Sequence, residues 1–188
     1  VLVIPIYFSV GSVLGIRFGN DSLIYYTFAV GFFEELIKFF PVLIFALVYG
    51  KKEDPYHYMV IAALSALLFA TLENKIYFER YSIDIMDTRG LFTVILHIFD
   101  TSVITYFLVW RLFQKEGKGV VLWTLLGFVI MVISHALYDW FLANELLFFA
   151  VIMFPFAVHM LADMYNNTLN IAKSFDYERV IEYKKNSF

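Results

Sequence analysis

An apolar run from residue 23 to residue 50 contains three ionisable side chains, Glu34, Glu35 and Lys38, within five positions. About 20 apolar residues are enough for a helix to cross the hydrocarbon core of a bilayer. A charged side chain at the centre of a bilayer costs roughly 2.5–3.5 kcal/mol on insertion scales. Three such groups on one helix therefore need polar partners, and these must come from elsewhere in the chain.

The composition indicates that this run belongs to an integral membrane protein. The 188 residues are 61% hydrophobic and 16% charged, whereas soluble domains are about half apolar and a quarter charged. We therefore expect an all-α fold, a polytopic helix bundle within the lipid bilayer. The net charge of -3 and the lack of a basic cluster argue against nucleic-acid binding. The absence of cysteine excludes disulfides, cysteine zinc ligands and a thiol nucleophile.

Apolar runs separated by polar breaks predict about six membrane segments. They cover residues 1–16, 23–49, 56–78, 91–113, 120–142 and 146–165. We expect Asn20 or Asp21 to cap the second helix and Pro41 to kink it. Residues 79–90 are polar and predict a connection or a short re-entrant piece. Residues 1–165 would form the transmembrane core, and the tail 166–188 would lie at the membrane surface or in the cytoplasm.

Lysine and arginine are distributed unevenly between the two sides of this topology. One side holds three of them, Arg17, Arg80 and Arg89. The other side holds nine, namely Lys51, Lys52, Arg111, Lys115, Lys118, Lys173, Arg179, Lys184 and Lys185. Because cytoplasmic loops are enriched in these residues, the second side is predicted to be cytoplasmic.

Four predicted helices carry polar groups at a similar depth on the opposite, outer side. In addition to the cluster on the second helix, these are Glu73 and Asn74 on the third helix, His97 and Asp100 on the fourth, and His135 and Asp139 on the fifth. Ionisable residues within a membrane usually mark a functional site, because their cost is otherwise unexplained. We therefore predict that these groups meet in one site in the outer half of the bilayer.

The histidine spacings favour carboxylate partners on the same helix. His135 and Asp139 are four residues apart, so the carboxylate can accept from one ring nitrogen and fix the tautomer. His97 and Asp100 are three residues apart and could pair in the same way. A structural role is nevertheless favoured for Asp100, and Asn74 is as well explained by a bond to a neighbouring helix.

The first motif has the spacing of a helical ion pair. Glu34 and Lys38 are four residues apart, so Lys38 is predicted to be the counter-ion of Glu34 and to leave Glu35 for chemistry. Two kinds of chemistry remain open. Two histidines with two or three carboxylates can hold zinc and leave a position for water. Alternatively, a carboxylate alone can be the general base, while histidine and asparagine stabilise an oxyanion.

Taken in order, the motifs resemble those of the PrsW family of intramembrane proteases. They are Glu-Glu-x-x-Lys from Glu34 to Lys38, Phe-x-x-x-Glu-Asn from Phe69 to Asn74, the histidine His97, and His-x-x-x-Asp from His135 to Asp139. CAAX prenyl endopeptidases and Abi proteins are similar at a greater distance. The CAAX branch has histidine where this chain has Glu73, and arginine one position after Lys38. These departures argue against a prenyl substrate.

The resemblance implies a helical endopeptidase, often called a metalloprotease. It would be a multi-pass protein in the cell membrane of a bacterium or archaeon. Its partner would be a membrane-anchored protein substrate, such as an anti-sigma factor, cut on the extracytoplasmic side. Glu34 and Glu35 would activate water, with Glu35 the first choice for the base. His97 and His135 would be ligands or oxyanion donors, and Asp139 would orient His135. Glu73 and Asn74 would complete the site. Zinc or another divalent metal would be held by Glu35, Glu73, His97 and His135.

Other functions remain open from the residues alone. A proton-coupled transporter could use the Glu and His cluster as a relay, although the inverted repeats and broken helices of such proteins are not evident. A CAAX-type prenyl-protein endopeptidase is an alternative within the hydrolases. A catalytically idle membrane protein would tolerate changes at Glu35 and His135.

Overall fold

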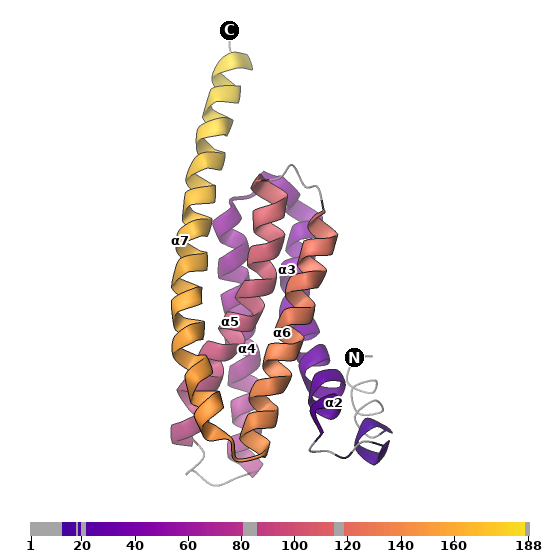
Figure 1. Ribbon diagram of the computed structural model, residues 1–188. Helices are drawn as coiled ribbons and strands as arrows, with labels where there is room; N and C mark the ends of the chain where they lie inside the picture. The colour runs from indigo at the N-terminus through magenta and orange to yellow at the C-terminus, as the bar shows by residue number, and fades with distance from the viewer. Residues whose placement is uncertain (1–12, 18, 20–21, 81–85, 115–118, 187–188) are drawn as a thin grey trace.

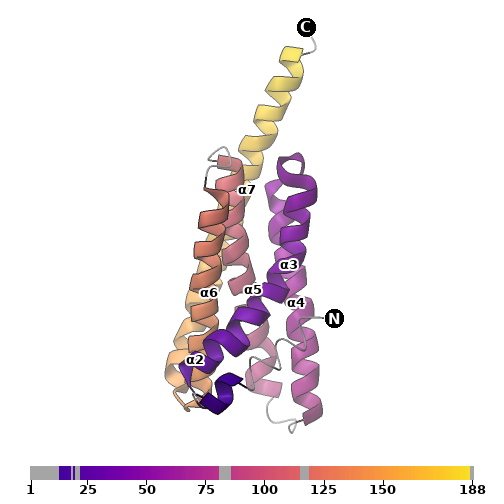
Figure 2. The ribbon, with the colours of Figure 1, turned by 90° about the vertical axis from the view of Figure 1, so that its right-hand side faces the viewer.

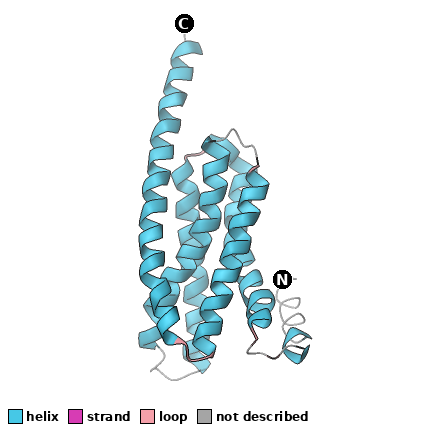
Figure 3. Cartoon of the chain, in the orientation of Figure 1, coloured by secondary structure: helices cyan, strands magenta, loops and turns pink. Residues whose placement is uncertain are grey.

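The computed structural model describes residues 13–17, 19, 22–80, 86–114 and 119–186, and within these ranges every regular element is a helix (Figure 1; Figure 3). The main helices are α3 (Phe32–Tyr49), α4 (Pro55–Arg80), α5 (Met86–Val109), α6 (Val120–Ala143) and α7 (Leu147–Asn186). The shorter elements are α2 (Leu23–Tyr25), the π-helix η1 (Tyr26–Gly31), the 3₁₀ turn η2 (Gly50–Lys52) and the π-helix η4 (Trp110–Gln114). The predicted all-α fold is confirmed.

Four of the described helical stretches are long and apolar enough to cross a membrane: Pro55–Glu79, Phe92–Phe113, Val120–Ala143 and Leu147–Asp176. They correspond to the third to sixth predicted segments and confirm a polytopic helical membrane protein. The second predicted segment contains α3, which carries Glu34, Glu35 and Lys38 and so differs from the four apolar stretches. The first predicted segment lies largely outside the described residues, so the count of six stays a prediction.

The helix α5 lies at the centre of the bundle. Of its apolar window 67% is buried, against 17–28% in the other three candidate spans. It packs against α4, α6 and α7, and buries the hydroxyl residues Thr101, Ser102 and Thr105. On α4, fully buried alanines at 62, 66 and 70 form a stripe of small side chains, of the kind that lets membrane helices approach closely.

Apolar side chains cover the outside of the bundle, as a lipid environment requires. Leu122 and Leu125 on α6, and Phe148 and Phe156 on α7, are among the exposed large hydrophobic residues. In water these side chains would be an aggregation hazard, whereas hydrocarbon chains solvate them. The polar residues of the site face inward instead, which is the arrangement expected of a membrane bundle.

Several predicted boundaries change in the structure. The cap of the second helix is Ser22, whose side chain accepts from the backbone N–H of Tyr25, whereas Asn20 and Asp21 lie outside the described residues. Pro41 lies inside α3, and the helix continues to Tyr49. The predicted connection at 79–90 is partly helical, because α4 extends to Arg80 and α5 begins at Met86.

The sixth membrane segment and the C-terminal tail form one continuous helix. α7 extends from Leu147 to Asn186 and projects beyond the other helices (Figure 1; Figure 2). The expectation that the helix ends near residue 165 was wrong. No glycine or proline follows between residues 166 and 188 to stop the helix.

Candidate active site

A close contact between helices places the first motif against α6. A Cβ added to Gly31 would lie 2.9 Å from the backbone oxygen of Val132 and 3.7 Å from the backbone nitrogen of Ala136. Gly31 ends the π-helix η1, three residues before Glu34, and Val132 precedes His135 by three residues. Only a residue without a side chain fits this contact, and it brings the glutamates within reach of His135.

Replacing Gly31 with alanine is expected to destabilise the protein by about 1–3 kcal/mol, because a backbone oxygen cannot move aside as a side chain can. It should also slow any reaction that needs Glu34 and His135 in contact. Thermal unfolding in detergent and a cleavage assay measure the two effects. Gly90→Ala is the matched control, since a Cβ there meets nothing within 4 Å. Equal behaviour of the two variants would contradict this role for the contact between η1 and α6.

His135 lies among carboxylates that come from three helices. Its Nδ1 is 2.7 Å from Oε1 of Glu35 and 3.8 Å from Oδ2 of Asp100. Its Nε2 is 3.3 Å from Oδ2 of Asp139 and 3.5 Å from Oε2 of Glu34. The pairing of His135 with Asp139, predicted from the spacing, is present. The ring itself is almost wholly buried, with 5% of the side chain exposed.

A second chain of contacts links α3, α5 and α4 through Lys38 and His97. Nζ of Lys38 donates to Oε1 of Glu35 at 2.5 Å and lies 2.8 Å from Nδ1 of His97. Nε2 of His97 lies 2.9 Å from Oε2 of Glu73. Lys38 and Glu35 are completely buried. The ring of Phe69 lies beneath the ammonium, with 5.4 Å between Nζ and the ring centroid.

The predicted pairing of Lys38 with Glu34 was therefore wrong. Lys38 pairs with Glu35, three residues away, while Glu34 points toward His135. Residues i+3 and i+4 share one helical face, so sequence spacing alone does not choose between the two acids. The choice depends on α6, whose histidine contacts both glutamates.

A small cavity adjoins the two histidines. Its volume is about 20 Å³, room for a single water molecule. The lining residues come from α4, α5, α6 and α7: Glu73, Thr93, Leu96, His97, Asp100, Ser134, His135, Tyr138, Asp139 and Met153. Two histidines and three acids thus border a space in which a water could be held and deprotonated.

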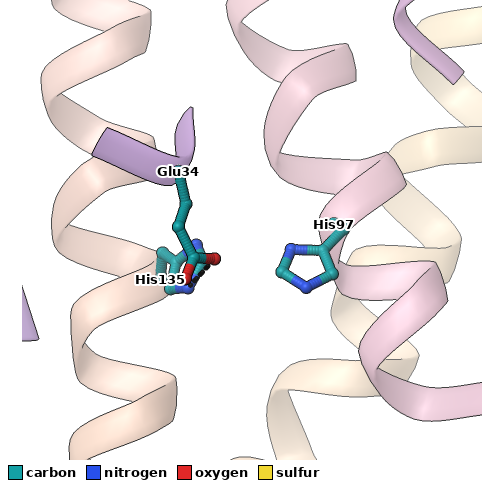
Figure 4. A group of neighbouring side chains, drawn as sticks. All are labelled: Glu34, His97 and His135. Carbon is teal, nitrogen blue, oxygen red and sulfur yellow. Dashed lines mark ion pairs between the residues drawn. The ribbon is translucent and has the colours of Figure 1, made fainter. Parts of the chain in front are cut away.

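Two groups of side chains have donor atoms close enough to hold a metal ion. The first donor group is Glu34, His97 and His135, and the second donor group is Glu35, Asp100 and His135; within each group the donor atoms lie within 4.8 Å of one another. Figure 4 shows the first donor group, with Glu34 and His135 together on one side and His97 opposite. Oε2 of Glu34 and Oε2 of Glu35 are buried without a hydrogen-bond partner among the described residues.

The structure brings most of the predicted site residues together, but not all of them. Glu34, Glu35, Glu73, His97, His135 and Asp139 are linked by direct contacts. Asn74 is buried, but its Oδ1 has no hydrogen-bond partner among the described residues. It borders a separate groove on α4 with Thr71 and Phe78.

Two residues of the site, Asp100 and Lys38, make contacts that differ from those that their sequence spacing predicts. Asp100 approaches His135 and lines the cavity, rather than pairing with His97 as its spacing suggested. Lys38 contacts both Glu35 and His97. The signal for Asp100 was present in the sequence, since positions 97 and 100 lie on one face of α5 and His97 already pointed to the site.

Comparison with known proteins agrees with this arrangement. The family model described as PrsW family intramembrane metalloprotease matches residues 2–162. Protease PrsW of Bacillus subtilis is 29% identical over 160 residues, 85% of this chain and 72% of that protein. Protease PrsW of Geobacillus kaustophilus is 28% identical over 109 residues, 58% of this chain and 48% of that protein.

The alignments cover between 48% and 72% of the length of these two relatives. No solved structure shows a significant match to the chain. The family match includes all four motifs, from Glu34 to Asp139, that meet around the two histidines. The chain belongs to the PrsW family of intramembrane metalloproteases.

Proposed function

We propose that this protein is an intramembrane endopeptidase. It hydrolyses a peptide bond of a membrane-anchored protein with a water that is activated by the buried acids and histidines of α3, α4, α5 and α6. The observation that carries the proposal is the contact of Glu34 and Glu35 with His135 and of Glu73 with His97, next to a cavity of water size that Glu73 and the two histidines line. Peptide hydrolysis needs a base for water and donors for the oxyanion, and acids and histidines supply both.

Glu34 is the residue that we assign as the base. The sequence favoured Glu35, but Oε1 of Glu35 already accepts from Lys38 and His135, and the side chain is completely buried. Glu34 keeps 13% of its side chain exposed, and its Oε2 has no hydrogen-bond partner among the described residues. A carboxylate oxygen that is free to accept from water is what a general base requires. Glu35 then holds Lys38 and His135 in place.

The donors present fit a divalent metal. Two histidine nitrogens and one glutamate oxygen are a common set for catalytic zinc, and the first donor group supplies them with a buried oxygen that lacks a partner. Glu34, His97 and His135 would hold the ion, so the free oxygen of Glu34 would be a ligand when the ion is bound and the base for water when it is not. When bound, it would polarise the substrate carbonyl and acidify a water. Oε2 of Glu73 lies at hydrogen-bond distance from Nε2 of His97, and Oδ2 of Asp139 contacts Nε2 of His135. Each contact limits rotation of its histidine ring.

Removing the metal is expected to abolish cleavage if the first donor group works in this way. The purified protein should contain about one zinc or similar ion per chain, lose activity on dialysis against a chelator, and regain it on addition of zinc. Metal analysis and a cleavage assay follow both changes. Full activity in a chelated protein free of metal would leave the carboxylate route, in which Glu34 acts on water without an ion.

The side of the membrane is part of the proposal. The positive charges favour a cytoplasmic location for the end that carries Lys51 and Lys52, which leaves the site toward the outer half. A single-span substrate with a different tag at each end tests this. We expect the outer tag to be released while the inner tag stays in the membrane. Release of the inner tag would reverse the orientation, and proton flux in liposomes without any cleavage would favour a transporter.

A further inference from the structure

The ammonium of Lys38 lies where a metal ion would need to bind. It contacts one member of each donor group, Glu35 at 2.5 Å and His97 at 2.8 Å. The lysine is completely buried. A positive charge inside a set of metal-binding side chains is an unusual neighbour, because it repels the ion that the set would attract.

The hydrogen bonds of His97 define which of its atoms could bind a metal. An ammonium has no acceptor, so Lys38 donates and Nδ1 of His97 carries the lone pair. The ring proton is then on Nε2, which donates to Oε2 of Glu73 at 2.9 Å. A histidine that donates one N–H to a carboxylate and offers its other nitrogen is the usual form of a metal ligand. The offered nitrogen here is Nδ1, and Lys38 already uses it.

We propose that Lys38 and a divalent metal ion are alternative occupants of the lone pair on Nδ1 of His97, so that Lys38 sets the metal affinity of the site. One lone pair accepts from an ammonium or coordinates a metal, but not both. Binding of a metal to the first donor group therefore requires Lys38 to leave His97. The buried Oε2 of Glu35, which has no hydrogen-bond partner among the described residues, is a further acceptor to which the ammonium can turn.

This role differs from that of a simple counter-ion. A counter-ion of Glu35 would stabilise the bundle, and its loss would weaken every function of the site together. If Lys38 instead competes with the metal for His97, its removal increases the metal affinity of the site. The inference rests on the proposed function for the donor set, but metal affinity is measured without any cleavage, so either can fail alone.

The test is zinc affinity, measured in detergent by competition with a chromophoric chelator. Lys38→Met removes the ammonium, and Lys38→Gln removes its charge. Both variants are expected to bind zinc at least about tenfold more tightly than the wild type. Lys38→Arg keeps the charge and should bind no more tightly than the wild type. Lys75→Met is the control, because Lys75 is exposed and pairs with Glu79.

Two results would overturn the proposal. One is equal or weaker zinc binding by either neutral variant that remains folded, as judged by its thermal unfolding. The other is a gain that persists when His97→Ala is added to Lys38→Met, because the metal would then not be bound through His97. Use of both Met and Gln keeps the test available if one of the two variants does not fold.

Discussion

Replacing Glu34 with glutamine is expected to lower cleavage of a single-span substrate by at least about 100-fold, because a neutral amide does not take a proton from water. The change preserves size and leaves the contacts of Glu35 with Lys38 and His135 in place. The folded amount and melting temperature should therefore stay close to those of the wild type. Immunoblots of tagged substrate, normalised to the amount of enzyme, measure the loss.

Glu35→Gln separates the two neighbouring acids. It removes the charge partner of a completely buried lysine, so it should reduce stability more than Glu34→Gln does and reduce cleavage less at a temperature where both variants are folded. Glu53→Gln is the control, since Glu53 lies in the turn between α3 and α4 with 38% of its side chain exposed, and contacts only His57 among the described ion pairs. If Glu35→Gln abolished cleavage while Glu34→Gln retained it, the assignment of the base would be reversed.

Replacing His135 with alanine is expected to have the largest combined effect on stability and activity. Four carboxylates from three helices lie within 3.8 Å of its ring nitrogens, so its removal leaves all four without this shared partner. Breaking a buried charged contact typically costs about 3–5 kcal/mol, and loss of a stabilising donor slows a reaction by roughly 100-fold or more. Chemical unfolding in detergent and cleavage at low temperature measure the two effects.

The chain contains its own control for this experiment. His159 and Asp163 repeat the His-x-x-x-Asp spacing on α7, and Oδ2 of Asp163 is 3.5 Å from Nε2 of His159. This pair is exposed, with 77% of the His159 side chain accessible, so His159→Ala should change neither property measurably. A similar loss in both variants would mean that the motif acts by its local helix contact and not by its place among the buried acids.

Much of this architecture could be predicted from the sequence, because a membrane imposes strong rules. Apolar runs of about 20 residues predict spanning helices, and four such runs are helices in the structure. Ionisable residues within those runs predict a common site, since each needs a partner. His97 and His135 were placed together on that ground, and their ring centroids lie 5.4 Å apart.

The rotation of each helix could not be predicted with the same success. Positions three and four residues apart share a face, so the acid that pairs with Lys38 depends on the neighbouring helix and not on the spacing. Asp100 is a separate case: Thr101 and Ser102 follow it in the sequence and favour a local structural role, whereas its carboxylate lies 3.8 Å from Nδ1 of His135 on α6. The π-helix η1 adds to the difficulty, because it shifts the phase of the chain shortly before Glu34.

Close approach of two backbones is also hard to infer from one sequence. Gly31 lies in an apolar run, where a glycine often has no special role, and its contact with Val132 depends on where α6 is placed. The continuity of α7 is different, since the lack of glycine and proline after residue 165 was visible in the sequence. There the mixed composition of the tail was given more weight than the absence of a helix stop.

The most direct test of the central claim is cleavage by the purified chain in liposomes that contain a single-span substrate. The products are identified by mass spectrometry, with Glu34→Gln protein reconstituted in parallel. We expect the wild type to produce a new carboxyl terminus within or beside the outer half of the substrate span, and the variant to produce none. An intact substrate with the folded wild type, or equal cleavage by the two proteins, would contradict the account.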